Sequence, residues 1–250
     1  MFAGLAAGRA FGSILAVDIE VGQHVVRRIG GIALNLDTLW ATGIAIAVVL
    51  TLGFVLRARV TSGVPGRIQV FWEALVDQTR GQVEGSVGSR GAAIVPLAIC
   101  LFLLILIENW VDVLPNVVKP DIFVAPTADV DTTFAYALVV IILVHIASVR
   151  ARGVKGYVSH YFKPYKALFP INLIEEIAKL FTLPLRLFGN MFAGGLMLTL
   201  IGALPLFFLP LSVPVATAWK VFDMGIGIIQ AFIFALLTIL YFGMAMEAGH

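Results

Sequence analysis

An arginine near the centre of a long apolar segment is the residue whose chemistry most needs an explanation. Arg186 lies within residues 171–210, too far from either end to reach the edge of a bilayer easily. Its guanidinium stays protonated, and a mid-bilayer position costs about 2.5–3.5 kcal/mol or more. We therefore expect a functional, permanent positive charge inside the membrane. The alternative is an arginine that an internal acid such as Asp223 neutralises for packing alone.

Other polar residues of this segment share one helical face with Arg186. Steps of four, three, four and four residues separate them: Glu175, Lys179, Thr182, Arg186 and Asn190. Near and within residues 218–246 a similar face carries Thr217, Lys220, Asp223, Gly227, Gln230 and Thr238. Such a stripe is stable in a membrane only when it faces protein or water, so each stripe predicts a partner or a hydrated path.

Each stripe residue also has a purely structural interpretation. Asp223 and Gln230 could be interhelical hydrogen-bond partners. Glu175 and Glu176 could be an acidic pair at a helix start. Lys179, one turn later, could simply pair with Glu175.

Polar residues elsewhere are interpreted as structural first. His145 is a lone histidine on an apolar span, where packing or a satisfied hydrogen bond is the preferred interpretation. Asp129 and Asp131 are interpreted as solvated loop acids before relay groups. Cys100, the one cysteine, excludes an internal disulfide and is expected to be a packing residue. Motifs for phosphate, nucleophile or metal chemistry are absent from the sequence, so we expect no cofactor, metal or nucleotide chemistry.

Composition requires lipid as the solvent. Hydrophobic residues make up 60% of the chain and charged residues 13%, against about 45–50% and about 25% in soluble domains. The net charge of +2 is small and unclustered, which argues against a nucleic-acid partner. The sequence predicts an all-α membrane protein, with a tail over residues 1–37, no convincing signal peptide, and one membrane domain over 38–250.

About five segments are long and apolar enough to cross a bilayer. They are residues 38–56, 91–111, 132–149, 171–209 and 218–246. Residues 67–90 mix apolar and charged side chains, which predicts an amphipathic helix on the membrane surface, or alternatively part of a helical hairpin of soluble type.

The last two segments exceed a simple span. About forty residues make about 60 Å of helix, twice the hydrocarbon thickness of about 30 Å. Long, strongly tilted helices are therefore expected, with bends possible at Pro184 and Gly194–Gly195. A re-entrant hairpin is the competing geometry.

Loop charge predicts the orientation. Residues 57–90 and 150–170 each carry five Lys or Arg, whereas 112–131 carries four Asp and one Lys. By the positive-inside rule the basic loops are cytoplasmic, so the N-terminus is outside and the C-terminus inside.

Several runs resemble subunit a of F-type ATP synthases. Residues 185–194, LRLFGNMFAG, resemble the signature around that family's essential arginine. Residues 229–245, IQAFIFALLTILYFGMA, are similar to its last helix. Residues 170–179 (PINLIEEIAK), 108–115 (ENWVDVLP) and 126–133 (PTADVDTT) resemble its other landmarks in the right order. The resemblance covers about Thr38 to the C-terminus.

The resemblance implies two long tilted helices against a rotating ring of c subunits. Arg186 would face the ring carboxylate, Asn190 would belong to the same motif, and Gln230 would lie near the arginine. Asp223 would form part of the outer half-channel. The implied partners are the c-ring, the b subunits of the peripheral stalk and the F1 sector, in a bacterial inner membrane.

Two positions depart from the family pattern. Gly195 stands where many relatives carry an acid or His, and Asn172 where many carry Glu. We therefore assign the outer path to Asp223. The acids at the mouth of this path are expected to be Asp112, Asp129 and Asp131. Glu175 and Glu176 are expected to line the inner mouth.

These assignments predict a proton-translocating subunit with two half-channels and Arg186 as the electrostatic gate between them. A secondary transporter is the first alternative, but it predicts internal repeats that the sequence lacks. A structural anchor is the second, and it leaves a mid-membrane arginine unexplained. Ion choice, H⁺ or Na⁺, and the ring size stay open.

Overall fold

The computed structural model describes residues 26–29, 32–61, 63–111, 125–162, 165, 169–204 and 209–246. Most of the predicted tail over 1–37 and the predicted path residue Asp112 lie outside these residues. Within the described part, five helices are long and apolar enough to cross a membrane. They are α2 (Leu36–Arg59), α4 (Ile94–Val111), α5 (Val130–His160), α6 (Phe169–Gly202) and α7 (Leu209–Met246). The prediction of an all-α, multi-pass membrane protein is confirmed.

Shorter elements flank these helices. The less apolar α3 (Arg67–Val87) follows α2, and the 3-10 turns η1 (Ser89–Ala93) and η2 (Pro126–Ala128) precede α4 and α5. Strands β1 (Val26–Ile29) and β2 (Ile32–Asn35) form an antiparallel hairpin directly before α2. The sequence reasoning did not predict this hairpin.

Two glycines turn the chain from α3 into α4. Gly88 ends α3 with φ 75°, a conformation that other residues rarely adopt. Gly91 then packs against α3, because a Cβ there would lie 2.5 Å from Cγ1 of Val83. This close approach lets α4 fold back beside α3.

The turn between the last two helices lies earlier than predicted. α6 ends at Gly202 and α7 begins at Leu209, against predicted bounds of 171–209 and 218–246. Pro210 falls in the first turn of α7, where a missing N–H costs nothing. α6 continues as one helix through Pro184 and the glycine pair, so it is neither broken nor re-entrant there.

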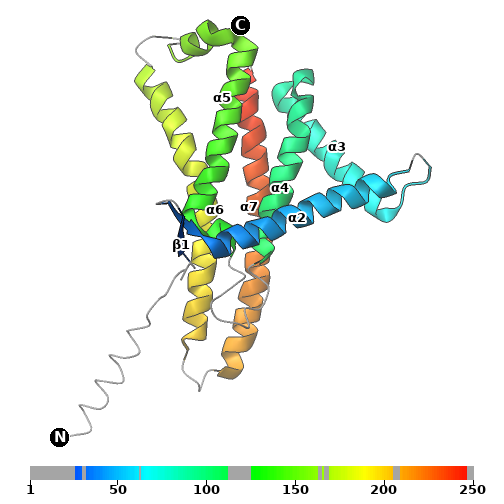
Figure 1. Cartoon of the computed structure of the whole chain (residues 1–250), viewed down its shortest axis with the longest axis vertical. Helices are drawn as coiled ribbons and strands as arrows, with labels where there is room; N and C mark the ends of the chain where they lie inside the picture. Colours follow the sequence, from blue (N-terminus) through cyan, green and yellow to red (C-terminus); the bar gives the residue numbers. More distant parts are fainter. Residues whose placement is uncertain are drawn as a thin grey trace, which may run out of the picture.

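The two long helices form an antiparallel hairpin. Their 34 and 38 residues correspond to about 51 and about 57 Å of helix. In Figure 1 this hairpin continues past the ends of α4 and α5, and α2 crosses its direction steeply. The five apolar helices therefore cannot all stand along one membrane normal, and the long pair exceeds the length that a core of about 30 Å requires.

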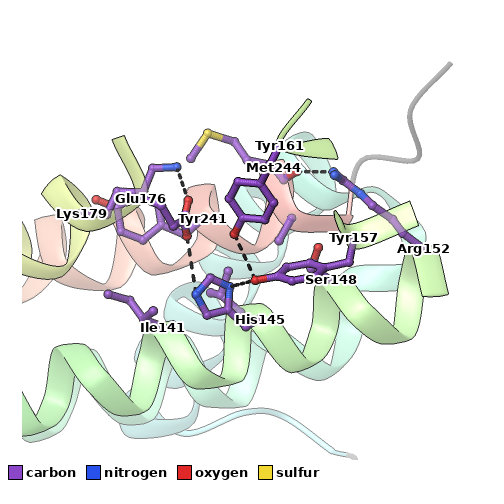
Figure 2. Close-up of a pocket in the computed structure, with 12 residues that line it drawn as sticks. Ile141, His145, Ser148, Arg152, Tyr157, Tyr161, Glu176, Lys179, Tyr241 and Met244 are labelled. Carbon is purple, nitrogen blue, oxygen red and sulfur yellow. Dashed lines mark hydrogen bonds and ion pairs between the residues drawn. The ribbon is translucent and has the colours of Figure 1, made fainter. Parts of the chain in front are cut away.

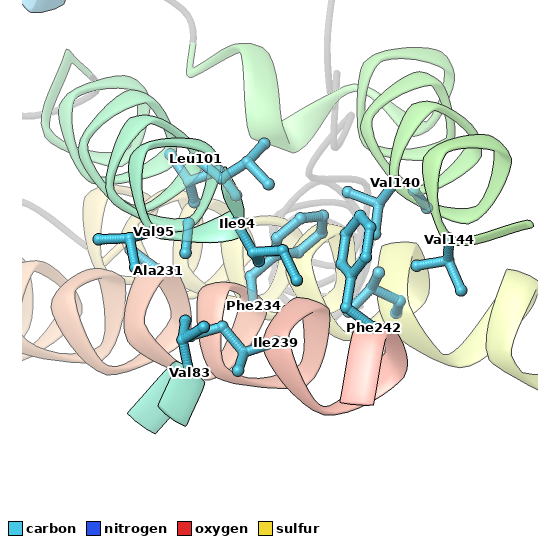
Figure 3. Close-up of a cluster of buried hydrophobic side chains, with 14 of the residues drawn as sticks. Val83, Ile94, Val95, Leu101, Val140, Val144, Ala231, Phe234, Ile239 and Phe242 are labelled. Carbon is cyan, nitrogen blue, oxygen red and sulfur yellow. The ribbon is translucent and has the colours of Figure 1, made fainter. Parts of the chain in front are cut away.

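The core lies where α3, α4, α5 and α7 meet, with α6 on its edge (Figure 3). Phe234 and Ile105 are its largest fully buried side chains. α2 contributes little, since its buried residues, which are Asp37, Thr38, Ala41 and Ala45, all lie in its first half. The rest of α2 presents an apolar surface outward.

Candidate functional site

Arg186 stands on the outer side of α6. Seventeen residues separate it from the start of the helix at Phe169 and sixteen from its end at Gly202. Its neighbours Leu183 and Leu187 are buried against the rest of the protein, whereas Arg186 itself is exposed. The packing face of α6 thus turns the guanidinium outward at the middle of an apolar helix.

Arg186 has no acidic partner within the part of the chain that the structure describes. The alternative that Asp223 neutralises it is wrong, because the Asp223 carboxylate lies beside Gly194, about two turns further along α6. None of the described acids therefore neutralises the positive charge of Arg186.

A side-chain hydrogen bond joins the two long helices one turn from the arginine. The Asn190 amide donates to Oε1 of Gln230 across 2.8 Å. Gln230 is 3% exposed, so this bond is shielded from water. Such bonds contribute about 0.6–2 kcal/mol in a membrane. The pair holds α6 and α7 in register beside Arg186, as the structural interpretation of Gln230 expected.

Asp223 of α7 lies against Gly194 of α6. A Cβ at Gly194 would meet its Oδ1 at 2.5 Å. The indole N–H of Trp219, one turn earlier, donates to the Gly194 carbonyl across 3.2 Å. The missing side chain of Gly194 therefore makes room for the Asp223 carboxylate. A Cβ at the neighbouring Gly195 would meet no atom within 4 Å.

The other predicted outer acids begin α5. Asp129, 9% exposed, caps the helix by accepting from the Asp131 N–H across 3.1 Å. It also accepts from the Asn35 amide across 3.0 Å. Asp131 is exposed. Asp129 is therefore a buried capping residue rather than a solvated loop acid, whereas Asp131 does face outward.

Two buried polar residues of α4 were not predicted from the sequence as site residues. Asn109 donates to the Gly227 carbonyl across 3.1 Å and accepts from Thr127 across 2.7 Å. Glu108, 0% exposed, accepts a hydrogen bond from Tyr136. The sequence shows both as polar residues in the run ENW at the end of an apolar segment. Their hydrogen-bond partners, however, lie on other elements of the chain.

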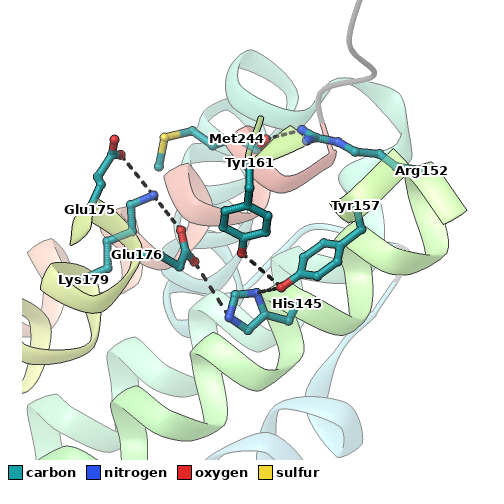
Figure 4. A network of polar contacts seen from close by, with 8 residues as sticks. All are labelled: His145, Arg152, Tyr157, Tyr161, Glu175, Glu176, Lys179 and Met244. Carbon is teal, nitrogen blue, oxygen red and sulfur yellow. Dashed lines mark hydrogen bonds and ion pairs between the residues drawn. The ribbon is translucent and has the colours of Figure 1, made fainter. Parts of the chain in front are cut away.

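The predicted inner acids meet a lysine. Lys179 lies 3.2 Å from Glu175 and 3.2 Å from Glu176, so it pairs with both (Figure 4). Glu175 is mostly exposed, whereas the side chain of Glu176 is 26% exposed and turns inward. The structural interpretation of Lys179 is confirmed, and it leaves Glu176 as the inward-facing acid of the pair.

His145, interpreted from the sequence as a packing residue or one with a satisfied hydrogen bond, contacts this inner group. Its Nε2 lies 3.8 Å from Oε1 of Glu176, and its Nδ1 lies 3.4 Å from the Tyr157 hydroxyl. Tyr157 in turn contacts the Tyr161 hydroxyl at 3.0 Å. Burial raises the pKa of Tyr161, so this hydroxyl stays protonated. These residues line a cavity of about 50 Å³ between α5, α6 and α7 (Figure 2).

Asn172, one of the two positions that depart from the family pattern, binds the backbone beside the cavity. Its side-chain amide donates to the backbone carbonyl of Tyr161 across 2.9 Å. The bond ties the start of α6 to the end of α5.

Known proteins that are similar to most of this chain belong to one family. The sequence pattern of the family described as ATP synthase A chain matches residues 39–243. ATP synthase subunit a of Acidothermus cellulolyticus is 46% identical over 237 residues, which cover 94% of this chain and 86% of the relative. The protein of the same name from Mycobacterium marinum is 47% identical over 249 residues, with 94% and 96% covered. That of Desulforamulus reducens is 35% identical over 230 residues, with 88% and 84% covered.

Proposed function

Since the chain belongs to the ATP synthase A chain family, we propose that it is the proton-translocating subunit of the Fo motor and that Arg186 is its electrostatic gate. The residues named above would form two offset half-channels against a ring of c subunits. No observation favours the alternative of a secondary transporter.

The exposed guanidinium of Arg186 carries this proposal. A permanent cation at the middle of an apolar helix needs a negative partner. Because the described residues supply none, we assign the partner to another subunit. A ring carboxylate that passes Arg186 during rotation meets that need.

The proton path follows from the electrostatics of a carboxyl group in lipid. A proton that arrives along Asp223 neutralises a ring carboxylate, and the neutral carboxyl can then rotate through lipid. After nearly a full turn it reaches the inner path near Glu175 and Glu176 and releases the proton. Arg186 favours the resulting carboxylate by lowering its pKa, and it repels protons that would pass directly between the paths. The driving force is the pH gradient together with about 2.3 kcal/mol per charge per 100 mV.

We assign the outer mouth to three acids. Asp129 and Asp131 lie at the start of α5, and Asp112 follows the last residue of α4 in the sequence. Asn190 and Gln230 position the long helices around the arginine. The domain over 38–250 works as one unit in a bacterial inner membrane, with the N-terminus outside and the C-terminus cytoplasmic. The b subunits and the F1 sector complete the complex.

Replacement of Arg186 by Ala tests this function. We expect loss of ATP-driven proton pumping in inverted membrane vesicles and loss of ATP synthesis, because the ring carboxylate loses its counterion. Arg59→Ala is the matched control, since Arg59 is an exposed arginine in the last turn of α2. Coupled activity that survives Arg186→Ala while the complex assembles would overturn the proposal.

A further inference from the structure

A small cavity on the side of α6 that faces α5 and α7 contains the inward-facing acid. Its volume of about 50 Å³ has room for a few water molecules. Figure 2 shows the His145 ring, the Tyr157 hydroxyl and the Glu176 carboxylate converging there. The side chains of His145 and Glu176 are 34% and 26% exposed, so the group is half-buried and open to solvent on one side.

A single glycine brings these residues together. Tyr157 follows His145 by 12 residues, which in a straight helix would place them about 18 Å apart along the axis. Gly153, with φ 70° and ψ 165°, breaks the helical path of α5 between them. The chain then folds back, and the Tyr157 ring meets the His145 ring edge-on at 5.9 Å between centroids.

We propose that His145 is a proton-exchange residue of the inner half-channel, which takes protons from Glu176 and passes them through this cavity toward the cytoplasm. The inference rests on the proposed function and names a further residue of its inner path.

The two ring nitrogens of His145 make the transfer possible. Neutral His145 with its proton on Nδ1 donates to the Tyr157 oxygen and offers the Nε2 lone pair to protonated Glu176. The Glu176 proton moves to Nε2 through a water that bridges the 3.8 Å between the two groups, and leaves a carboxylate. The Nδ1 proton then passes to Tyr157 as the Tyr157 proton passes to Tyr161 and the Tyr161 proton to water. One proton enters at Glu176 and one leaves at Tyr161, and a flip of the imidazole ring restores the starting tautomer.

The charges around His145 come from three helices. On α6, the Glu176 carboxylate faces Nε2 of His145 and is paired with Lys179. On α5, Arg152 is directed to the Met244 carbonyl across 2.6 Å, and the Tyr157 hydroxyl contacts the Tyr161 hydroxyl at 3.0 Å. On α7, Tyr241 lies under Lys179 at 5.7 Å. Glu176 is therefore the acid that faces the imidazole.

The test measures passive proton flux in inverted vesicles stripped of F1, where the cytoplasmic face is outside. A lumen-positive potential drives protons outward. We expect His145→Gln to reduce the flux by about tenfold, because Gln keeps a polar side chain of similar size but cannot accept and release a proton.

Further variants separate transfer from structure. Tyr157→Phe keeps the ring contact and should lower the flux, whereas Tyr165→Phe, at an exposed tyrosine, should not. Imidazole in the medium should partly restore flux to His145→Ala. Equal proton flux in the wild type and in His145→Gln would overturn the inference. If Arg186→Ala still couples, the proposed function itself fails; if it does not couple and the two fluxes are equal, only the role of His145 fails.

Discussion

At the scale of single residues, position within a helix decides what each charge can do. Arg186 is exposed on the outer face of α6, whereas Glu176, ten residues earlier, turns toward the cavity. Asp223 is enclosed by the helix pair, against Gly194. These three charged residues therefore lie apart from one another. The proposed pair of half-channels, with Arg186 as the barrier between them, requires such a separation.

Asp223 provides a prediction at this scale. Asp223→Ala removes the carboxylate from the α6–α7 interface, and we expect about tenfold lower proton flux with normal assembly, because a proton-transfer group is lost. ATP-driven pumping by inverted vesicles and the amount of subunit in the membrane measure the two effects.

Thr51→Val is the matched control, because the exposed Thr51 hydroxyl of α2 donates to the Ala47 carbonyl of its own helix, across 2.7 Å. An unchanged rate in Asp223→Ala would move the outer path elsewhere. Gly194→Ala offers an independent approach, since its methyl group would displace the carboxylate from its place.

At the scale of helices, the break in α5 is the feature with the clearest consequence. A φ of 70° with ψ 165° is open essentially to glycine alone. No atom lies within 4 Å of a Cβ at Gly153, so the backbone conformation alone resists substitution.

Gly153→Ala should cost about 1–3 kcal/mol in the bent conformation and shift α5 toward a straight helix. With Cys100 replaced by Ser, the pair His145→Cys and Tyr157→Cys should react with a short bifunctional reagent, and Gly153→Ala should lower the yield several-fold. Mass spectrometry of the linked peptide measures the yield. Gly43→Ala, in open space on α2, is the control, and an equal yield in both variants would contradict the bend as the cause.

At the scale of the whole molecule, the apolar surface that is left uncovered indicates lipid and partner subunits. Trp40 and Phe54 of α2 are 70% and 66% exposed, and Ile174 and Val221 of the long pair are each 65% exposed. The outer face of the long pair includes Arg186, which no lipid tail can satisfy. We therefore expect a polar group of a neighbouring protein to cover that part.

Mild-detergent purification therefore tests the assembly. We expect the chain to copurify with many copies of a small two-span hairpin protein, because a closed ring is needed to present a carboxylate to Arg186 at every step. Gel analysis with mass spectrometry measures the composition. A chain that elutes alone and transports a solute by itself would instead support a secondary transporter.

The sequence alone determined the membrane class, the five apolar helices and the place of Arg186 in the middle of one of them. These follow from composition and from periodicity along one helix, which are local properties. The tertiary structure alone decided which polar residues meet. His145 with Glu176, Asn109 with Gly227 and Asn190 with Gln230 are 31, 118 and 40 residues apart. Their contacts depend on how helices pack, and for His145 with Tyr157 on one positive φ at Gly153, which no periodic pattern records.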